Sequence, residues 1–304
     1  MQSPDLDRFS SRRSTRYGQR GAVATSQPLA AQTGVSVLED GGNAFDAAVA
    51  TAAALNVVEP TSTGLGGDVF ALYRTADGEV GAMRSCGPAP ADATIENVSE
   101  ALADEQDVDP ADAEMPMTGP QTVTVPGTAR GWEATAERFG EKELGELLQP
   151  AIRYATEGYP VSEGIASAWD YGEELFEHDN ARDAYLFDGE SPDVGQTVTL
   201  PKLGESLHRI AEAGADVVYE GDIADEIVDE VPTTYNGAEV FELPPNNQGL
   251  VALEALNIAE ELGAGEHPID SPERVHYFAE ATKLAFEDGH HYITDPAFED
   301  HPPL

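Results

Sequence analysis

The stretch TSTGLGGDVFALYR at residues 61–74 contains three glycines beside a carboxylate. Glycine-rich loops bind phosphates when a strand precedes them and a helix follows, because the helix N-terminus then faces the anion. Here residues 43–58 predict a helix before the glycines, and residues 69–84 predict two strands after them. We therefore expect no nucleotide site. Gly64, Gly66 and Gly67 are expected to mark a tight backbone crossing where only glycine fits.

The only cysteine of the chain, Cys86, follows the second predicted strand, with Arg84 two residues earlier. The period of two along a strand places both side chains on one face. A neighbouring cation favours the thiolate and could activate a nucleophile. A lone cysteine is more commonly a packing residue, and this is the interpretation we adopt.

The segment EDGHHYITDP clusters Asp288, His290, His291 and Asp295, which are residue types that bind zinc. The alternative is a solvated helix end, with the histidines near the negative end of the dipole. No second His or Cys cluster supports a metal, and no G-x-S-x-G motif indicates a hydrolase elbow. We expect neither a metal nor a cofactor.

The elements that must position these residues form a helix-rich pattern without regular strand–helix alternation, which indicates an α/β (α+β) fold. Thr122 to Val125 predicts a short strand. An acidic segment at 99–115 predicts an exposed loop, and Pro150 suits the first position of a new helix. Further helices are predicted at 26–38, 130–139, 143–148, 150–157, 203–213, 248–262 and 271–287.

Charge separates the chain into two parts, an arm at 1–20 and a domain at 21–304. The whole has 57 acidic and 16 basic residues and a formal net charge of −41. A surface of this sign repels nucleic acid. It suits the solvated coat of a halophile's cytoplasmic protein, our preferred interpretation, or a surface that binds cations. The arm carries five arginines and either docks on the acidic surface or is a disordered end.

No membrane span or signal peptide is predicted, because no apolar run approaches the required length. With 40% hydrophobic residues, the chain can form a packed core.

Seven blocks in order resemble the γ-glutamyltranspeptidase (glutathione hydrolase) family. The SRRSTRYGQRG start of the chain and the GLGGD and PPNNQG motifs are most similar to the signal-less intracellular branch of that family. The blocks are RGAVATSQPLAAQTGVSVLEDGGNAFDAAVA (20–50), STGLGGDVFALY (62–73), APADAT (89–94), VPGTARGW (125–132), QPAIRYATEGYPVS (149–162), ELPPNNQGLVALEALNI (242–258) and AEATKLAFEDGHHYITDPAF (279–298).

The resemblance implies a four-layer αββα sandwich of the N-terminal-nucleophile hydrolase type. The family's enzyme cuts itself, and the new N-terminal Thr attacks a γ-glutamyl amide such as glutathione. That Thr follows the DPAF block in the family, whereas this sequence ends six residues after Phe298. We therefore expect a large-subunit portion, inactive alone, whose partner is a small-subunit segment that carries the nucleophile.

Other interpretations stay open at this point. The chain could be a catalytically dead remnant or a binding module, and the substrate could be a small amide such as oxamate. Thr233 and Thr234 resemble the family's cleavage sequence, but they precede ELPPNNQG, so we expect a loop or strand there.

The resemblance also implies an Arg that binds the substrate carboxylate, three residues before an Ala-Pro pair. If Gly87-Pro88 occupies that pair, the family Arg is Arg84. If Ala89-Pro90 occupies that pair instead, Cys86 lies at the position of the family Arg, and this chain lacks the Arg. We favour Arg84, because a guanidinium binds a carboxylate in two places. Gly289 is a further departure, since many members have Arg there.

Overall fold

A computed structural model describes residues 17–221, except 91–92, 117–118, 120–121, 174–175 and 177–178. It also describes residues 223–225, 227, 258, 262, 267 and 271–292, with side chains up to residue 284. The chain divides into two compact units, Tyr17–Phe241 and Met1–Arg16 with Glu242–Leu304.

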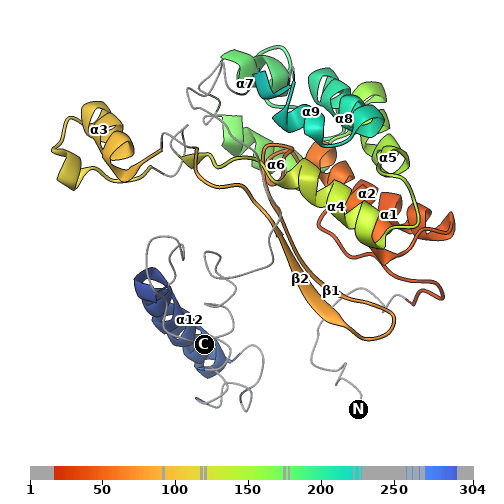
Figure 1. Cartoon of the computed structure of the whole chain (residues 1–304), viewed down its shortest axis with the longest axis horizontal. Helices are drawn as coiled ribbons and strands as arrows, with labels where there is room; N and C mark the ends of the chain where they lie inside the picture. The colour runs from red at the N-terminus through yellow and green to blue at the C-terminus, as the bar shows by residue number, and fades with distance from the viewer. Residues whose placement is uncertain are drawn as a thin grey trace. The chain divides into compact units, whose positions relative to one another are not determined.

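Two N-terminal helices, α1 (Pro28–Glu39) and α2 (Ala44–Val58), pack against each other (Figure 1). The side chain of Asn43 accepts the backbone N–H groups of Phe45 and Asp46, while Asp46 accepts that of Asn43. This reciprocal capping box begins α2 where the sequence predicts it. Small alanines let α2 pack closely against its neighbours, and ten of its 15 residues are buried.

The predicted strand pair is confirmed as an antiparallel hairpin of β1 (Val69–Arg74) and β2 (Val80–Ser85). Tyr73 on its inner face meets the rings of Phe45 and Phe139, whose centroids lie 5.7 and 4.8 Å away. The outer face carries Phe70 and Leu72, which are 50% and 84% exposed. The hairpin thus has one packed face and one apolar face that the described residues leave open.

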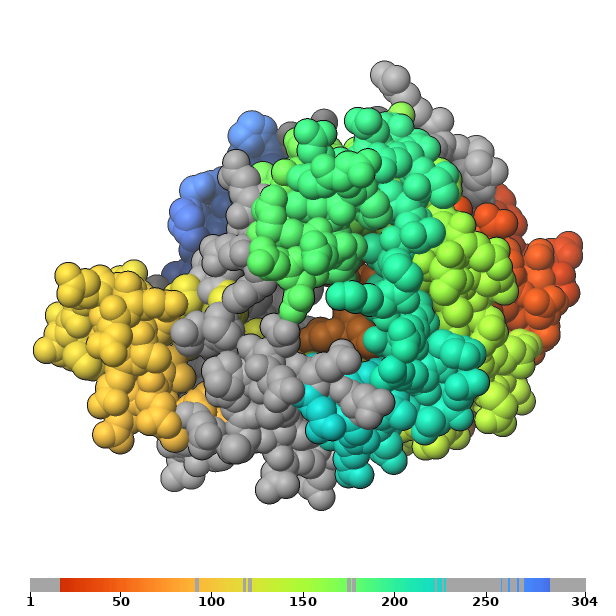
Figure 2. Space-filling view, turned by 90° about the horizontal axis from the view of Figure 1, so that it is seen from above, coloured from red at the N-terminus to blue at the C-terminus, as the bar shows by residue number. Residues whose placement is uncertain are grey.

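The core lies where α2, α4 (Thr128–Phe139), α5 (Leu144–Glu157) and α8 (Pro201–Ala213) meet. Trp132, Leu147 and Leu207 are at most 2% exposed there. Figure 2 shows the yellow-green segment of α5 beside the teal segment of α8, and these two helices are in contact. The remaining elements of this unit are β3 (Tyr159–Pro160), α6 (Glu163–Gly172), α7 (Asp179–Tyr185), β4 (Thr197–Val198) and α9 (Asp216–Tyr219).

Three sequence predictions were wrong. Most of the acidic segment at 99–115 is helix α3 (Ile95–Gln106) and a 3-10 helix (Pro110–Asp112), because Thr94 caps α3 and Leu102 is buried. Pro150 lies inside α5, whose buried stripe continues past it and offsets the lost hydrogen bond. Residues 122–125 form no strand. Val125 alone exchanges two backbone hydrogen bonds with the 87–88 segment.

The predicted C-terminal helix is confirmed as α12 (Pro272–Tyr292), where the Ser271 hydroxyl accepts the Arg274 backbone N–H at 3.2 Å. Apart from residues 258 and 262, the predicted helix at 248–262 lies outside the described residues, and so does most of the basic arm. None of the helices in the described part of the chain combines the length and apolar composition that a membrane crossing needs.

Candidate functional site

The glycine loop is fastened to the N-terminus of α4. The Gly67 carbonyl oxygen accepts the backbone N–H groups of Gly127 and Thr128 at 2.9 and 3.0 Å. The Thr128 hydroxyl donates to the Gly64 carbonyl oxygen at 3.3 Å. Two of the donors with which this helix N-terminus would hold a phosphate are therefore already used within the chain.

The expected backbone crossing exists, but the glycine with the least space at it is Gly127 and not one of the three glycines of the loop. A Cβ added at Gly64 or Gly66 would meet no heavy atom within 4 Å, and one at Gly67 would lie 3.2 Å from the Gly64 oxygen. A Cβ at Gly127 would lie 2.0 Å from the Ser85 carbonyl oxygen. The steric reason expected for Gly64 and Gly66 is thus corrected, because the chain crosses at Gly127.

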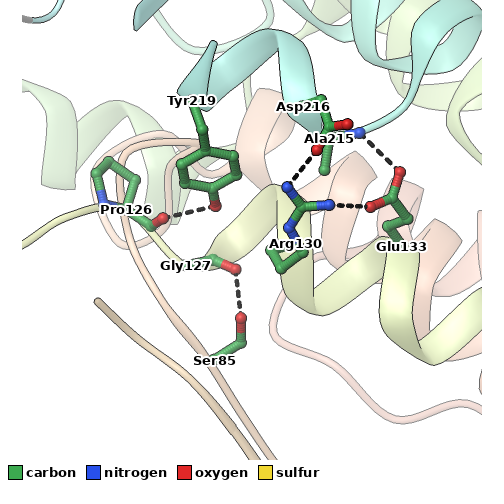
Figure 3. Close-up of polar contacts among 8 residues, drawn as sticks. All are labelled: Ser85, Pro126, Gly127, Arg130, Glu133, Ala215, Asp216 and Tyr219. Atoms are coloured by element: carbon green, nitrogen blue, oxygen red, sulfur yellow. Dashed lines mark hydrogen bonds and ion pairs between the residues drawn. The ribbon is translucent and has the colours of Figure 1, made fainter. Parts of the chain in front are cut away.

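Side chains secure the same crossing from two sides (Figure 3). The Ser85 hydroxyl donates to the Gly127 carbonyl oxygen at 2.7 Å, and the Tyr219 hydroxyl donates to that of Pro126 at 2.7 Å. Arg130 lies 5.2 Å from the centroid of the Tyr219 ring. These contacts hold the end of β2 against α4 and α9.

Arg130 is the centre of an ion-pair network in this region. Its guanidinium meets Glu133 and Asp216, each at 2.5 Å, and Glu133 also accepts the Ala215 backbone N–H at 2.8 Å. Sequence reasoning did not single out these residues. Arg130 and Glu133 lie three residues apart on α4, but their partners Asp216 and Ala215 lie more than 80 residues further along the chain, so no local pattern indicates the wider network.

Arg84 and Cys86 lie at the end of β2, as predicted. Arg84 pairs with Phe70 across the hairpin, so its side chain belongs to the open outer face. Burial raises the pKa of the Cys86 thiol, the Arg84 charge opposes this, and the Asp68 charge adds to it. Burial outweighs the cation, so the thiol is protonated at neutral pH and the packing interpretation is favoured.

Asp68 joins the glycine loop to this group. Desolvation raises the pKa of its carboxyl group, while the Gly127 backbone N–H opposes the change. Asp68 also lines a pocket of about 510 Å³ between α2, the glycine loop, β1 and α4. A pocket of this size accommodates a small molecule.

The structure does not describe the side chains of the other candidate residues for chemistry. The side chains of the proposed Asp288–His291 cluster, and all of Asp295, lie outside the described residues, as do Thr233 and Thr234. Within the described part of the chain, no three His, Cys, Asp or Glu side chains are grouped as metal ligands.

Comparison with known proteins identifies the fold and the family. The family model described as Gamma-glutamyltranspeptidase matches residues 30–234 and 226–304. The glutathione hydrolase-like YwrD proenzyme of Bacillus subtilis is 34% identical over 311 residues, covering 94% of this chain and 57% of that protein.

Two solved structures are similar to the chain. Cephalosporin acylase from Bacillus halodurans matches with 36% identity and a TM-score of 0.84, over 99% of this chain and 60% of the other. Helicobacter pylori γ-glutamyltranspeptidase matches with 28% identity and a TM-score of 0.81, over 95% and 88% of the two chains.

The chain spans about half the length of the curated relatives it matches. Its helix-rich α+β fold is the N-terminal-nucleophile hydrolase fold that the sequence blocks led us to expect. The family match covers most of the chain, and the chain belongs to the γ-glutamyltranspeptidase family.

Proposed function

We propose that these 304 residues form the large-subunit portion of a γ-glutamyltranspeptidase-like amidohydrolase. In this proposal the nucleophile is the N-terminal Thr of a small-subunit segment, which is distinct from residues 1–304. The observation that carries the proposal is the family match over residues 30–234 and 226–304, combined with coverage of 57% of the YwrD proenzyme.

The proposed reaction is acyl transfer through a covalent intermediate. The Thr hydroxyl attacks the carbonyl carbon of a γ-glutamyl amide, and the α-amine of the same Thr accepts the hydroxyl proton. The α-amine of Thr passes that proton to the nitrogen of the substrate amide. The C–N bond breaks, the substrate's amine leaves, and the acyl group remains as an ester on Thr. Water, or an acceptor amine, then attacks the ester and releases the acyl group.

Arg84 is the residue of this chain that we propose binds the α-carboxylate of the acyl donor. It lies on the outer face of the hairpin, near the end of β2, where its partner Phe70 is half exposed. A guanidinium presents two parallel N–H donors to a carboxylate and stays charged at every physiological pH. Its removal would weaken substrate binding rather than disturb the core.

The open hairpin face is consistent with a further layer of structure. Phe70, Leu72 and Val80 are 50%, 84% and 67% exposed, although apolar side chains of this size are normally covered. We propose that the segment with the nucleophile covers this face. A remnant without a partner would leave this face exposed.

The test is an activity assay on this chain joined to, or coexpressed with, its Thr-led small-subunit segment. Buffers contain about 2 M KCl, because we also propose that the acidic coat is an adaptation to high salt in the cytoplasm. A chromogenic γ-glutamyl anilide, glutathione and oxamate serve as substrates. Hydrolysis of the first two supports the proposal, while hydrolysis of oxamate alone favours the small-amide alternative.

Variants then test the role of Arg84. Arg84→Gln is expected to lower kcat/KM for γ-glutamyl substrates by about 30- to 100-fold, the equivalent of about 2–3 kcal/mol for a lost bidentate contact. Arg84→Lys keeps the positive charge but loses the two parallel N–H donors of the guanidinium, and we expect it to lower kcat/KM about tenfold.

Arg74 on β1 is the matched control, since its side chain lies on the same outer face of the hairpin as that of Arg84 on β2. Arg74→Gln is expected to change kcat/KM less than twofold. If the assembled protein is active and Arg84→Gln behaves like the control, Arg84 does not bind the substrate. If no substrate is turned over by the assembled protein, the enzymatic proposal itself is wrong.

A further inference from the structure

Ser85 follows Arg84 in the chain and forms the last pair of the hairpin, where it faces Val69. Its side chain is 5% exposed and belongs to the packed inner face, whereas that of Arg84 belongs to the outer face. The Ser85 hydroxyl donates to the Gly127 carbonyl oxygen at 2.7 Å, an ordinary length for such a bond. Figure 3 shows this bond between the end of β2 and the start of α4. The residue beside the proposed carboxylate contact is thus fastened to a helix.

Two glycines at the start of α4 leave room for Ser85 to come this close. A Cβ added at Gly131 would lie 2.9 Å from the Ser85 Cβ and 3.1 Å from the Val69 Cβ. A Cβ added at Gly127 would lie 2.0 Å from the Ser85 carbonyl oxygen. Gly127 and Gly131 are about one helical turn apart and face the same way. Close packing against bare helix backbone therefore sets the position of Ser85 together with the hydrogen bond.

The backbone is held on both sides of Arg84. Before it, β2 pairs with β1 along the whole strand. After it, the Gly87 backbone N–H donates to the Val125 carbonyl oxygen at 2.9 Å, and the Pro88 carbonyl oxygen accepts the Val125 N–H at 3.0 Å. A two-stranded hairpin is only marginally stable by itself. The end of β2 therefore depends on its contacts with residues 125–131 for its position.

We infer that Ser85 is a positioning residue for the acyl donor, because it holds the end of β2 where Arg84 can meet the α-carboxylate with two N–H donors. This inference rests on the proposed function and deepens it. A two-point contact needs both donors aligned with both carboxylate oxygens, and a binding group must be held within about 0.5 Å of its productive place. Ser85 itself touches no substrate, since its side chain lies on the buried inner face.

Loss of the Ser85 hydroxyl is expected to affect position more than stability. The Gly127 carbonyl oxygen also accepts the Gly131 backbone N–H at 2.9 Å, so it keeps a partner in Ser85→Ala. We expect the thermal midpoint of this variant to fall by roughly 1–6 °C. Tyr219→Phe is the matched control, because it removes a hydroxyl bond of the same 2.7 Å length from the carbonyl oxygen of Pro126, a residue outside the hairpin.

The experiment is steady-state kinetics on the assembled protein, this chain with its Thr-led segment, with the chromogenic γ-glutamyl anilide as substrate. Ser85→Ala is expected to raise KM about five- to tenfold and to change kcat less than about twofold, which is the pattern of lost substrate binding. Tyr219→Phe is expected to lower the thermal midpoint by a similar amount and to change KM less than about twofold.

A double variant tests whether Ser85 acts through Arg84. Once Arg84 is replaced by Gln, no guanidinium is left to position. Adding Ser85→Ala to Arg84→Gln is therefore expected to lower kcat/KM by less than about twofold further.

Three results would overturn the inference and leave the proposed function standing, provided that Arg84→Gln lowers kcat/KM. In the first, Ser85→Ala leaves KM unchanged. In the second, the effects of the two substitutions multiply in the double variant. In the third, Tyr219→Phe raises KM as much as Ser85→Ala does, which would show a general loosening of the crossing. An assembled protein that turns over no substrate, or whose activity is unchanged by Arg84→Gln, refutes the proposed role of this chain and the inference with it.

Discussion

Asp46 gives the sharpest test of how this fold is held together, because its carboxylate is fully buried and joins two distant segments. One oxygen accepts the Asn43 backbone N–H at 2.7 Å. The carboxylate also accepts the backbone N–H groups of Glu141 and Lys142, at 3.1 and 3.3 Å. These contacts cap α2 and tie it to the turn between α4 and α5.

Asp46→Ala would leave three backbone donors without their acceptor. Each partly or fully buried donor left unsatisfied costs about 1–3 kcal/mol. Water can reach some of the turn, so we expect a total loss of about 3–4 kcal/mol in the free energy of unfolding, at the upper end of single-substitution effects. Asp46→Asn keeps one acceptor oxygen and is expected to lose about half as much.

The measurement is urea unfolding followed by circular dichroism at high salt, with Asp104→Asn on the exposed side of α3 as a charge-matched control. For a unit of this size, the thermal midpoint of Asp46→Ala should fall by roughly 6–16 °C. A loss below about 1 kcal/mol would refute the reasoning, since the three donors would then be satisfied equally well without the carboxylate.

Two further predictions concern the crossing at the end of β2. Gly127→Ala is expected to lower the free energy of unfolding by at least about 3 kcal/mol, because the new methyl group would lie 2.0 Å from the Ser85 carbonyl oxygen. Gly66→Ala places its methyl group in open space and should change the free energy of unfolding by less than about 1 kcal/mol in the same urea assay. Equal effects would show that the crossing can relax. Alkylation of Cys86 by iodoacetamide should rise with pH at higher values than for an unperturbed thiol, and Arg84→Gln should move the profile higher still, because it removes the charge that favours the thiolate. A profile that moves to lower pH in this variant would contradict the assignment.

The sequence correctly predicted helix starts and strands whose defining residues lie within a few positions of one another. Asn43 and Ser271 cap α2 and α12 where the sequence places them, and the alternating strands of the hairpin form as expected. Such features depend on side chains that reach backbone groups two or three residues away. A single sequence therefore shows them directly.

The errors arose where a local signal was outweighed by packing. Pro150 normally starts or breaks a helix, yet α5 passes through it because Leu147 and Ala151 belong to one buried stripe. The charged segment around Leu102 was interpreted as a loop, although a Thr94 cap and two buried residues support a helix.

The sequence by itself determined the family, the helix-rich α+β fold, the hairpin and the acidic charge, because composition, periodicity and ordered motif blocks carry these properties. Only the tertiary structure decided that Gly127 is the crowded glycine of the crossing, that Asp46 joins α2 to a turn 95 residues later, and that Asn56 and Trp132 line one pocket with the glycine loop. Contacts between residues so far apart in the chain depend on how the elements pack, and packing leaves no local pattern to be read.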